Sequence, residues 1–177
     1  AGTNGKGSVA AFTESIMRKA GYRTGLYTSP HLIKVEERIK VHGEQITQYD
    51  FARLTNKVRH AIGTLLFNTT NKINKLKLQR HPTHFEILTA IALLYFAERQ
   101  VEIAVVEVGL GGRLDATNII DPVLAVITSI SFDHQAYLGK DLESITRKKI
   151  GIIKRKDWYS RYKKERLVLP IWDWMGF

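Results

Sequence analysis

The sequence predicts an α/β fold in which helices flank a mostly parallel sheet. Helix-like segments alternate with short β-branched runs along the chain. Two of these runs, residues 101–108 and 123–128, are almost continuously apolar, which is typical of strands buried on both faces of a parallel sheet. A glycine-rich segment, residues 2–8, opens directly into a helix pattern, as a loop at the edge of such a sheet does.

The first predicted helix covers residues 8–19. Its apolar residues recur at helical spacing, and Gly21 provides a stop at its C-terminal end. The apolar stripe comprises Val9, Phe12, Ile16 and Met17.

A short strand is predicted from Gly25, running into a loop at Pro30, because proline disfavours helix for the residue before it. Asp50 is predicted to cap a helix that runs to about residue 67 with its apolar residues on one face. Residues 68–81 are polar and basic, and we interpret them as an exposed loop.

The second half continues the alternation. Residues 83–100 form a strongly apolar helix pattern, and the strand over 101–108 ends in a glycine-rich loop over 109–115. The second buried strand is predicted over 123–128, and a last helix over 142–150.

The composition limits the class of protein. The chain has 177 residues, enough for one domain with a core. It contains no cysteine, which excludes disulfides and thiolate metal sites. No apolar run approaches the ~20 residues of a membrane helix, and no secretory leader pattern is visible. We therefore expect a cytoplasmic protein that does not act at a membrane, and we expect a monomer.

The formal net charge of +10 leaves two kinds of partner open. A nucleic acid is one, and an anionic small-molecule substrate is the other. The positive charge gathers in a polar stretch around residues 72–80 and in the tail from Lys154 onward, and is otherwise scattered. A solvated basic loop and tail explain this distribution better than a nucleic-acid interface, so we predict no nucleic-acid partner.

The segment at residues 2–8 has the residue types of a phosphate-binding loop. Glycines let backbone N–H groups wrap phosphates, a lysine reaches the β/γ-phosphates, and a hydroxyl holds Mg²⁺. One departure is that Gly7 separates Lys6 from Ser8, where the common pattern places lysine and hydroxyl side by side. The alternative is a simple glycine-rich turn before a helix. The predicted loop comprises Gly2, Thr3, Asn4, Gly5, Lys6, Gly7 and Ser8.

Further candidate residues follow the predicted strands. Glu107 ends the most apolar one, where ligands of open α/β sheets bind, and beside a phosphate loop its carboxylate suits Mg²⁺ better than solvent. Glu102, at the start of that strand, is expected to face solvent. His134, after Asp133, is predicted at the same edge of the sheet; it could bind a metal or a phosphate, or be structural. The glycines at 109–112 could approach a ligand or form an ordinary connection.

Seven motifs occur in order along residues 1–154. Taken together they resemble those of the folylpolyglutamate synthase/dihydrofolate synthase family, a branch of the Mur-ligase-like ATP-dependent amide ligases. The long motif at 107–118 is the most specific of them. The motifs are GTNGKGS (2–8), TSPHL (28–32), ERI (37–39) with Gly43-Glu44, THFE (83–86), EVGLGGRLDATN (107–118), Asp133-His134 with Leu138-Gly139, and KIGIIK (149–154).

The resemblance implies a ligase that forms C–N bonds in folate biosynthesis. ATP would phosphorylate the γ-carboxylate of a folate, or the carboxylate of dihydropteroate, and the amine of L-glutamate would attack the resulting acyl phosphate. The implied cofactors are ATP and Mg²⁺. The implied fold is a P-loop-type sheet with flanking helices, as an incomplete Mur-ligase-like ATPase domain.

The resemblance also implies roles for individual residues. Lys6 would neutralise the β/γ-phosphates, and Asn118 would join the loop in binding the nucleotide. A lysine at the position of Lys149 is carbamylated in the family, which makes it a metal ligand. The implied catalytic residues are Lys6, His134 and Lys149; the metal ligands are Ser8, Glu107, His134 and Lys149; and the substrate residues are Thr28, Ser29, Pro30, His31, Arg38, Arg113 and Asp115.

The two ends of the chain are unusual for such a domain. A strand is expected before the phosphate loop, but only Ala1 precedes Gly2, and composition changes after Lys154. We expect residues 1–154 to be part of an ATP-binding domain and residues 155–177 to be an atypical tail, either frame-shifted or disordered. The chain would then be an inactive fragment of a ligase. The alternatives are a non-catalytic product of a disrupted gene and another P-loop NTPase.

Overall fold

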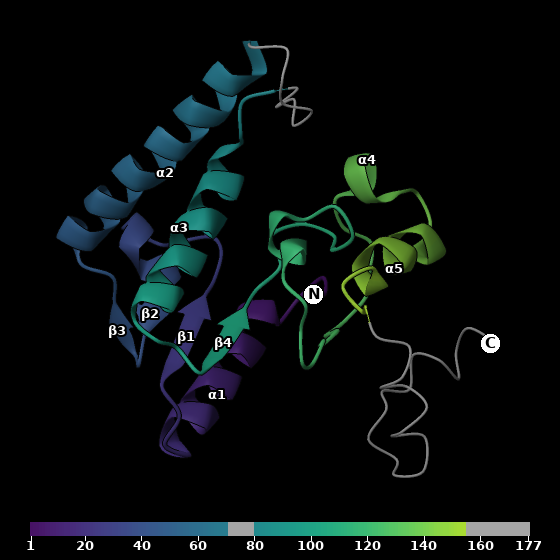
Figure 1. Ribbon diagram of the computed structural model, residues 1–177. Helices are drawn as coiled ribbons and strands as arrows, with labels where there is room; N and C mark the ends of the chain where they lie inside the picture. Colours follow the sequence, from purple (N-terminus) through teal and green to yellow (C-terminus); the bar gives the residue numbers. More distant parts are fainter. Residues whose placement is uncertain (71–79, 155–177) are drawn as a thin grey trace.

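The computed structural model describes residues 1–70 and 80–154 of the chain. Over these residues the chain forms an α/β fold, as predicted, with helices packed on a four-stranded sheet (Figure 1). The order of the strands in the sheet is β3-β2-β1-β4. The predictions for residues 155–177 lie outside the described residues.

The sheet is built around β1, Thr24–Tyr27, which has a hydrogen-bonded strand on each side. On one side β4, Ile103–Val106, runs parallel to it. On the other side β2, Ile39–Val41, and β3, Glu44–Gln45, follow as antiparallel strands. The sheet is therefore mixed. The pairing of β1 with β4 is parallel, as predicted, whereas β1 with β2 and β2 with β3 are antiparallel pairs.

A two-residue turn joins β2 to β3. His42 and Gly43 have φ angles of 53° and 88°, and positive φ at both positions is the mark of a type I′ turn, whose twist matches a hairpin. The strands on either side are too short to show the alternation that predicts a strand from sequence. The hairpin was therefore not predicted from the sequence.

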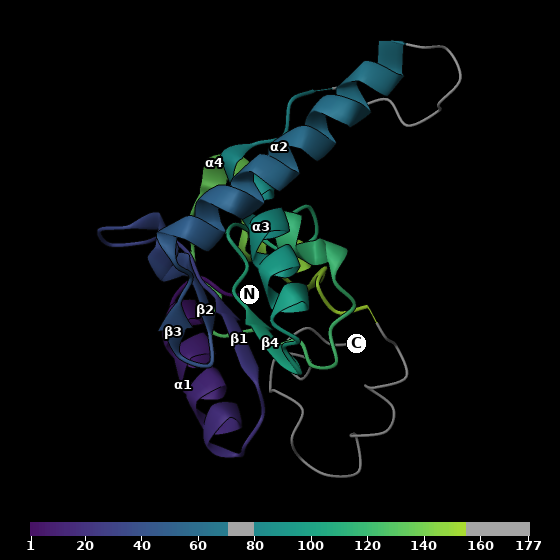
Figure 2. The same ribbon diagram turned by 60° about the vertical axis from the view of Figure 1, so that its left-hand side comes forward.

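Helices cover both faces of the sheet (Figure 2). The helix α1, Lys6–Lys19, packs against β1 and β4, and α3, His84–Glu98, packs on the opposite face of β1, where Gly25 approaches Phe96. The helix α2, Gln48–Thr70, lies alongside α3. Four short helices complete the described fold: η1, Val35–Arg38; η2, Ala116–Ile119; α4, Gln135–Leu138; and α5, Leu142–Ile150.

The main core lies between the sheet and the pair α2 and α3. The ring of Tyr27 stacks on Phe85 with centroids 5.9 Å apart, and its hydroxyl lies 3.4 Å from the Thr89 hydroxyl. A smaller, separate cluster packs under the loops that follow β4 and comprises Val108, Ile127 and Ile152. The main cluster comprises Tyr27, Ile39, Ile46, Leu54, Val58, Leu88, Ile91, Ala92, Tyr95 and Phe96.

The predicted start of α2 is wrong by a few residues. The backbone N–H of Asp50 donates to the hydroxyl of Thr47 at 3.0 Å, so Thr47 supplies the capping oxygen and the helix begins at Gln48. Asp50 instead forms ion pairs with Arg53 and Arg99. The helix also continues to Thr70, so residues 68–70 are helical and not part of the predicted loop; residues 71–79 lie outside the described residues.

Half of the apolar stripe predicted for α1 is exposed, although Val9 and Met17 are half-buried. Phe12 and Ile16 are 68% and 65% exposed, whereas Glu14 is buried. The carboxylate of Glu14 accepts a hydrogen bond from the Thr24 hydroxyl at 2.6 Å and pairs with Arg18. This polar contact with β1 turns the helix so that Phe12 and Ile16 point away from the sheet.

Two predictions about buried strands are also wrong. Residues 123–128 form no regular strand, because their backbone partner among the described residues is the short stretch 1–4, which is not a strand and belongs mostly to the glycine-rich loop at 2–8. Val123 and Leu124 are exposed. In β4, Ala104 is exposed, because β4 is the last strand of the described sheet and is not covered evenly on both faces.

The described residues include no helix that is long and apolar enough to cross a membrane.

Replacing Gly25 by alanine is expected to destabilise the chain by about 1–3 kcal/mol. A Cβ at this position would lie 2.9 Å from the ring of Phe96, which is held in the main core. Urea unfolding followed by circular dichroism measures the change in the free energy of unfolding.

The matched control is Gly63→Ala, where an added Cβ would meet no atom within 4 Å. Since Gly63 lies within α2, alanine is expected to stabilise there by up to about 1 kcal/mol. Equal effects at the two glycines would contradict the packing of α3 on β1.

Candidate functional site

The glycine-rich loop has a backbone that requires glycine at two positions. Gly2 has a φ of 151°, and a Cβ there would lie 1.8 Å from Oγ1 of Thr128. Gly5 has a φ of 78° and directly precedes the first residue of α1. The free backbone N–H groups of the first turn of α1 therefore face the loop, an arrangement that favours anions.

Residues 126–131 hold the loop from one side. The Thr3 hydroxyl donates to the carbonyl of Ser131 at 3.1 Å and accepts from the backbone N–H of Ser131 at 3.0 Å. The Thr128 hydroxyl donates to the carbonyl of Asn4 at 2.7 Å. Both hydrogen bonds of the Thr3 hydroxyl are therefore made with the backbone of Ser131.

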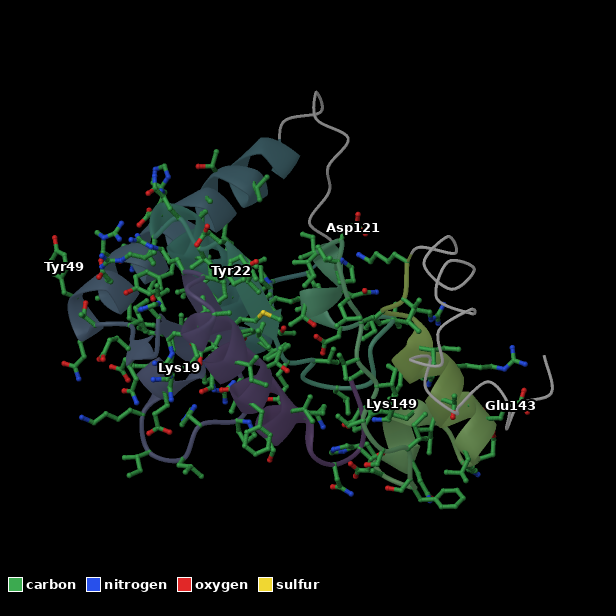
Figure 3. The ribbon with its side chains drawn as sticks, turned by 90° about the horizontal axis from the view of Figure 1, so that it is seen from below. Lys19, Tyr22, Tyr49, Asp121, Glu143 and Lys149 are labelled. Carbon is green, nitrogen blue, oxygen red and sulfur yellow. The ribbon has the colours of Figure 1, made fainter. Side chains whose placement is uncertain are left out.

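Two lysine ammonium groups meet at one oxygen of the loop. Nζ of Lys6 donates to the carbonyls of Gly2 and Thr3 at 3.0 and 3.1 Å. Nζ of Lys149 donates to the same Gly2 carbonyl at 2.9 Å. Lys149 lies on the inward side of α5, whereas Glu143 lies on its outer side (Figure 3). The predicted catalytic lysines are therefore brought together from opposite ends of the described chain.

The environment of Lys149 disfavours its charge. Lys149 is only 3% exposed. Burial lowers the pKa of the Lys149 ammonium below its ordinary value, and the positive charge of Lys6 lowers it further, while Asp133 acts in the opposite direction. The adjacent Lys148 points elsewhere, since its Nζ donates to the carbonyl of Tyr137.

The two lysines line a small cavity beside the loop after β4. Asp133 and His134 reach the same cavity, and Nε2 of His134 lies 3.6 Å from Oδ2 of Asp133. His134 directly precedes α4 and has a φ of 48°, which is the left-handed conformation that non-glycine residues adopt mainly in turns. The cavity is lined by Gly2, Lys6, Val108, Gly109, Leu110, Gly111, Asp133, His134 and Lys149.

Glu107 does not line this cavity. The carboxylate is buried, and its Oε2 accepts the backbone N–H of Ser29 at 3.1 Å. A Cβ added to Gly7 would lie 3.5 Å from the same oxygen, so glycine at this position lets the carboxylate approach α1. Ser8, in the first turn of α1, is exposed. Glu102 is exposed as expected, and accepts the backbone N–H of Arg23.

The predicted metal ligands do not form one protein cluster. Within residues 1–70 and 80–154, no three side chains of His, Cys, Asp or Glu gather as a metal site. Lys149 carries an ammonium, which repels cations. The assignment of Ser8, Glu107, His134 and Lys149 as ligands stays a prediction.

The loop at 113–118 is fastened to the C-terminal end of α5. Nδ2 of Asn118 donates to the carbonyls of Arg113 and Gly151 at 2.9 and 3.2 Å. The carboxylate of Asp115 accepts the N–H groups of Leu110 and Thr117. The side chains of Asp115 and Asn118 thus hold the loop itself. Their predicted roles, substrate binding for Asp115 and nucleotide binding for Asn118, stay predictions.

The predicted substrate loop leaves the end of β1. Its two ends are tied, because the N–H of Thr28 donates to the carbonyl of Arg38 at 3.0 Å. Nε of Arg38 donates to Nδ1 of His31 at 2.8 Å, so these two predicted residues do lie together. The Ser29–Pro30 peptide bond is cis. Glu37, which organises this loop, was not among the predicted site residues; its place just before Arg38 in the motif at 37–39 was the available signal.

Comparison with known families finds one matching model, the Mur ligase middle domain, over residues 51–162. This match covers more than half of the chain and includes both β4 and α5.

Individual relatives agree with that match. The chain is 44% identical over 155 residues to the dihydrofolate synthase/folylpolyglutamate synthase of Bacillus subtilis, a match that covers 87% of this chain and 34% of the relative. Escherichia coli FolC in complex with DHPP and ADP is 41% identical with a TM-score of 0.76, covering 88% of this chain and 34% of that one. An FPGS-AMPPCP-folate complex gives 40% identity and a TM-score of 0.79, covering 87% and 36%. The chain spans about a third of the length of the relatives it matches.

Lys149 is expected to make the stability of the chain depend on pH. A lysine whose folded pKa is lowered binds fewer protons in the folded state, so its destabilising effect is present below the folded pKa and is relieved as pH rises toward the unfolded pKa. Relative to Lys149→Met, the unmodified chain should therefore gain stability between pH 7 and pH 10. Urea unfolding at each pH measures this difference.

Lys148→Met is the control, since its ammonium donates to the exposed carbonyl of Tyr137. A difference between the unmodified chain and Lys149→Met that stays constant from pH 7 to pH 10 would contradict the burial of this ammonium.

Proposed function

The chain belongs to the Mur ligase middle-domain family, and on that basis we propose that it binds ATP at the glycine-rich loop as part of an ATP-dependent amide ligase. The observation that carries the proposal is the pair of ammonium groups, Lys6 and Lys149, that converge on the carbonyl of Gly2. Two cations at the N-terminal end of a helix favour a polyanion such as a triphosphate. Residues 1–154 would then form part of an ATP-binding domain.

The reaction we propose joins L-glutamate to a folate or to dihydropteroate. A carboxylate oxygen of the acceptor attacks the γ-phosphorus of ATP, which forms an acyl phosphate and releases ADP. The glutamate amine then attacks the acyl carbon, loses a proton, and displaces phosphate to leave the amide. The names of the relatives support this substrate class, since they are folylpolyglutamate and dihydrofolate synthases.

Within this reaction Lys6 has a simple task. Its Nζ rests on two loop carbonyls, and neither is as strong a partner as a phosphate oxygen. Binding of a nucleotide would draw the ammonium toward the β/γ-phosphates and neutralise charge there. Positioning and neutralisation of this kind provide most of the catalysis of phosphoryl transfer.

The residues present fit a magnesium ion that is held mainly by the nucleotide. Mg²⁺ commonly uses one or two protein oxygens together with phosphates and water, so a large cluster of acidic residues is not required. Glu107, beside Gly7, and Ser8, in the first turn of α1, would supply those oxygens. When bound, the ion would offset the negative charge of the phosphates.

We further propose that Lys149 becomes carbamylated. Its lowered pKa increases the share of neutral amine, which can add to carbon dioxide and lose a proton to give a carbamate. The modification would replace a buried cation with an anion beside Lys6, and His134 lines the same cavity. His134 would then share in holding a second metal ion.

The acceptor substrate would bind near the loops at 28–38 and 113–118. His31 and Arg38 form one polar pair there, and Arg113 adds a cation from the other loop. Glutamate completes the substrates. We propose a monomeric cytoplasmic protein with no nucleic-acid or membrane partner.

Glu107→Gln tests the magnesium assignment. The amide oxygen can still accept the N–H of Ser29, but the charge that favours a cation is lost. In the unmodified chain Mg²⁺ is expected to strengthen ATP binding, and in the variant this gain should fall by about tenfold or more. Calorimetric titration of ATP with and without Mg²⁺ measures it.

Glu102→Gln, at the other end of the same strand segment, is the matched control and should keep the full effect of Mg²⁺. Loss of ATP binding without Mg²⁺ in Glu107→Gln would instead indicate damage to the loop, and equal behaviour of both variants would remove Glu107 from the metal site.

A hybrid enzyme tests the ligase function. Residues 1–154 replace the aligned segment of the Bacillus subtilis relative, which matches this chain over 155 residues. The hybrid is expected to release phosphate only when ATP, Mg²⁺, glutamate and a folate or dihydropteroate are all present, and to form the glutamylated product.

The 177-residue chain measured by itself is expected to form no product, because the matched part of the chain covers only 34% of the Bacillus subtilis relative. Phosphate release by the hybrid at the same rate without an acceptor would favour another P-loop NTPase. Glutamate ligation by the isolated chain would contradict its proposed inactivity.

A further inference from the structure

A single carboxylate organises the exposed turn of the loop after β1. Oε2 of Glu37 accepts the backbone N–H of Leu32 at 2.8 Å. Oε1 accepts the N–H groups of Ile33 and Lys34 at 3.0 and 2.7 Å. These hydrogen bonds hold the pKa of the Glu37 carboxyl below its ordinary value, so the group is an anion at neutral pH.

The turn that Glu37 holds carries two apolar side chains outward. Leu32 is 93% exposed and Ile33 is 83% exposed. Single exposed apolar residues are common on proteins, but these two are adjacent, and the backbone N–H groups of both are bound by the same side chain. A turn that was free to move could fold such residues back onto the protein surface.

The same loop is joined to the phosphate loop. The N–H of Ser29 donates to Glu107, whose Oε2 would lie 3.5 Å from a Cβ on Gly7. The other end is closed by the hydrogen bond from Thr28 N–H to the Arg38 carbonyl. Glu37 therefore holds the turn within a loop whose two ends are hydrogen-bonded to each other and whose Ser29 is bound to Glu107, beside the proposed nucleotide site.

We propose that Glu37 is a positioning residue that presents Leu32 and Ile33 as an apolar contact for the ring system of the acceptor substrate. The proposal rests on the proposed function, because it takes the acceptor to be a folate or dihydropteroate. A flat aromatic ring system gains binding free energy from covering exposed aliphatic side chains, and the gain is larger when the turn is already in place before binding.

The neighbouring glutamate provides a contrast. Glu36 belongs to the same short helix, η1, but its carboxylate makes no hydrogen bond or ion pair with any residue in 1–70 or 80–154. The positioning effect is therefore expected of Glu37 and not of a negative charge anywhere in η1.

The kinetic test uses the hybrid enzyme, in which the reaction can be followed. In Glu37→Gln the side chain keeps one acceptor oxygen of two and loses its charge. The KM for the acceptor should rise about tenfold, or about 1.4 kcal/mol, while kcat and the KM for ATP stay within about twofold. Glu36→Gln should change none of the three constants.

A second variant leaves the hydrogen bonds of the turn in place. Replacing both Leu32 and Ile33 by serine removes the apolar contact, and since both are exposed the fold should be unaffected. This variant should reproduce the rise in the acceptor KM. An unchanged acceptor KM in the serine variant, or in Glu37→Gln, overturns the proposal, and so does an equal loss in kcat and in ATP binding.

Hydrogen exchange on the 177-residue chain tests the turn without any substrate. The backbone amides of Leu32, Ile33 and Lys34 should exchange at least tenfold faster in Glu37→Gln than in Glu36→Gln. Unchanged exchange means that Glu37 does not fix the turn and overturns the proposal. An unmodified hybrid that lacks acceptor-dependent ligation would instead count against the proposed function, and the exchange result would still decide whether Glu37 holds the turn.

Discussion

Two lysine side chains share the carbonyl oxygen of Gly2, and the rest of the site depends on this contact. Lys6 belongs to the first turn of α1 and Lys149 to the end of α5, so the shared oxygen joins the glycine-rich loop to a helix far along the chain. Since both ammonium groups contact one oxygen, they lie within about 6 Å of each other, and at an effective dielectric constant of ~20 their repulsion is about 3 kcal/mol. An anion bound between them would relieve that repulsion.

The parallel pairing of β1 and β4 sets the other half of the site. Tyr27 lies opposite Val106, and the N–H of Glu107 donates to the carbonyl of Tyr27 at 2.8 Å. The residues after both strands therefore leave the sheet side by side, which is why Glu107 can accept the N–H of Ser29. A buried carboxylate next to Gly7 and a loop that starts at Thr28 follow from the register of two short strands.

Local signals in the sequence predicted those parts of the fold that depend on local periodicity or on special backbone. The apolar repeat located α3 within two residues at each end, and the glycines at 2 and 5 marked a loop whose φ angles exclude most other residues. Contacts between distant residues were not predictable in this way. The rotation of α1 depends on Glu14 meeting Thr24.

The site shows the same division. The end of the predicted strand pointed to Glu107, whose buried carboxylate lies beside Gly7; its role as a metal ligand stays a prediction. The family resemblance pointed to Lys149, which no periodicity distinguishes from Lys148. Nothing in the spacing of residues revealed that Asn118 and Asp115 hold their own loop, or that Glu37 binds three backbone N–H groups. Such roles depend on how a loop closes, which is decided by the sheet and helices that carry it.

Mapping of amide chemical shifts on addition of Mg²⁺ and a non-hydrolysable ATP analogue tests whether the two lysines at Gly2 bind phosphate. If the lysine pair at Gly2 forms a phosphate site, the largest shifts should fall on residues 2–8, on the loop at 109–111 and on His134, and Lys6→Met should abolish them. Shifts concentrated elsewhere, or shifts at these residues that persist in Lys6→Met, would contradict the account.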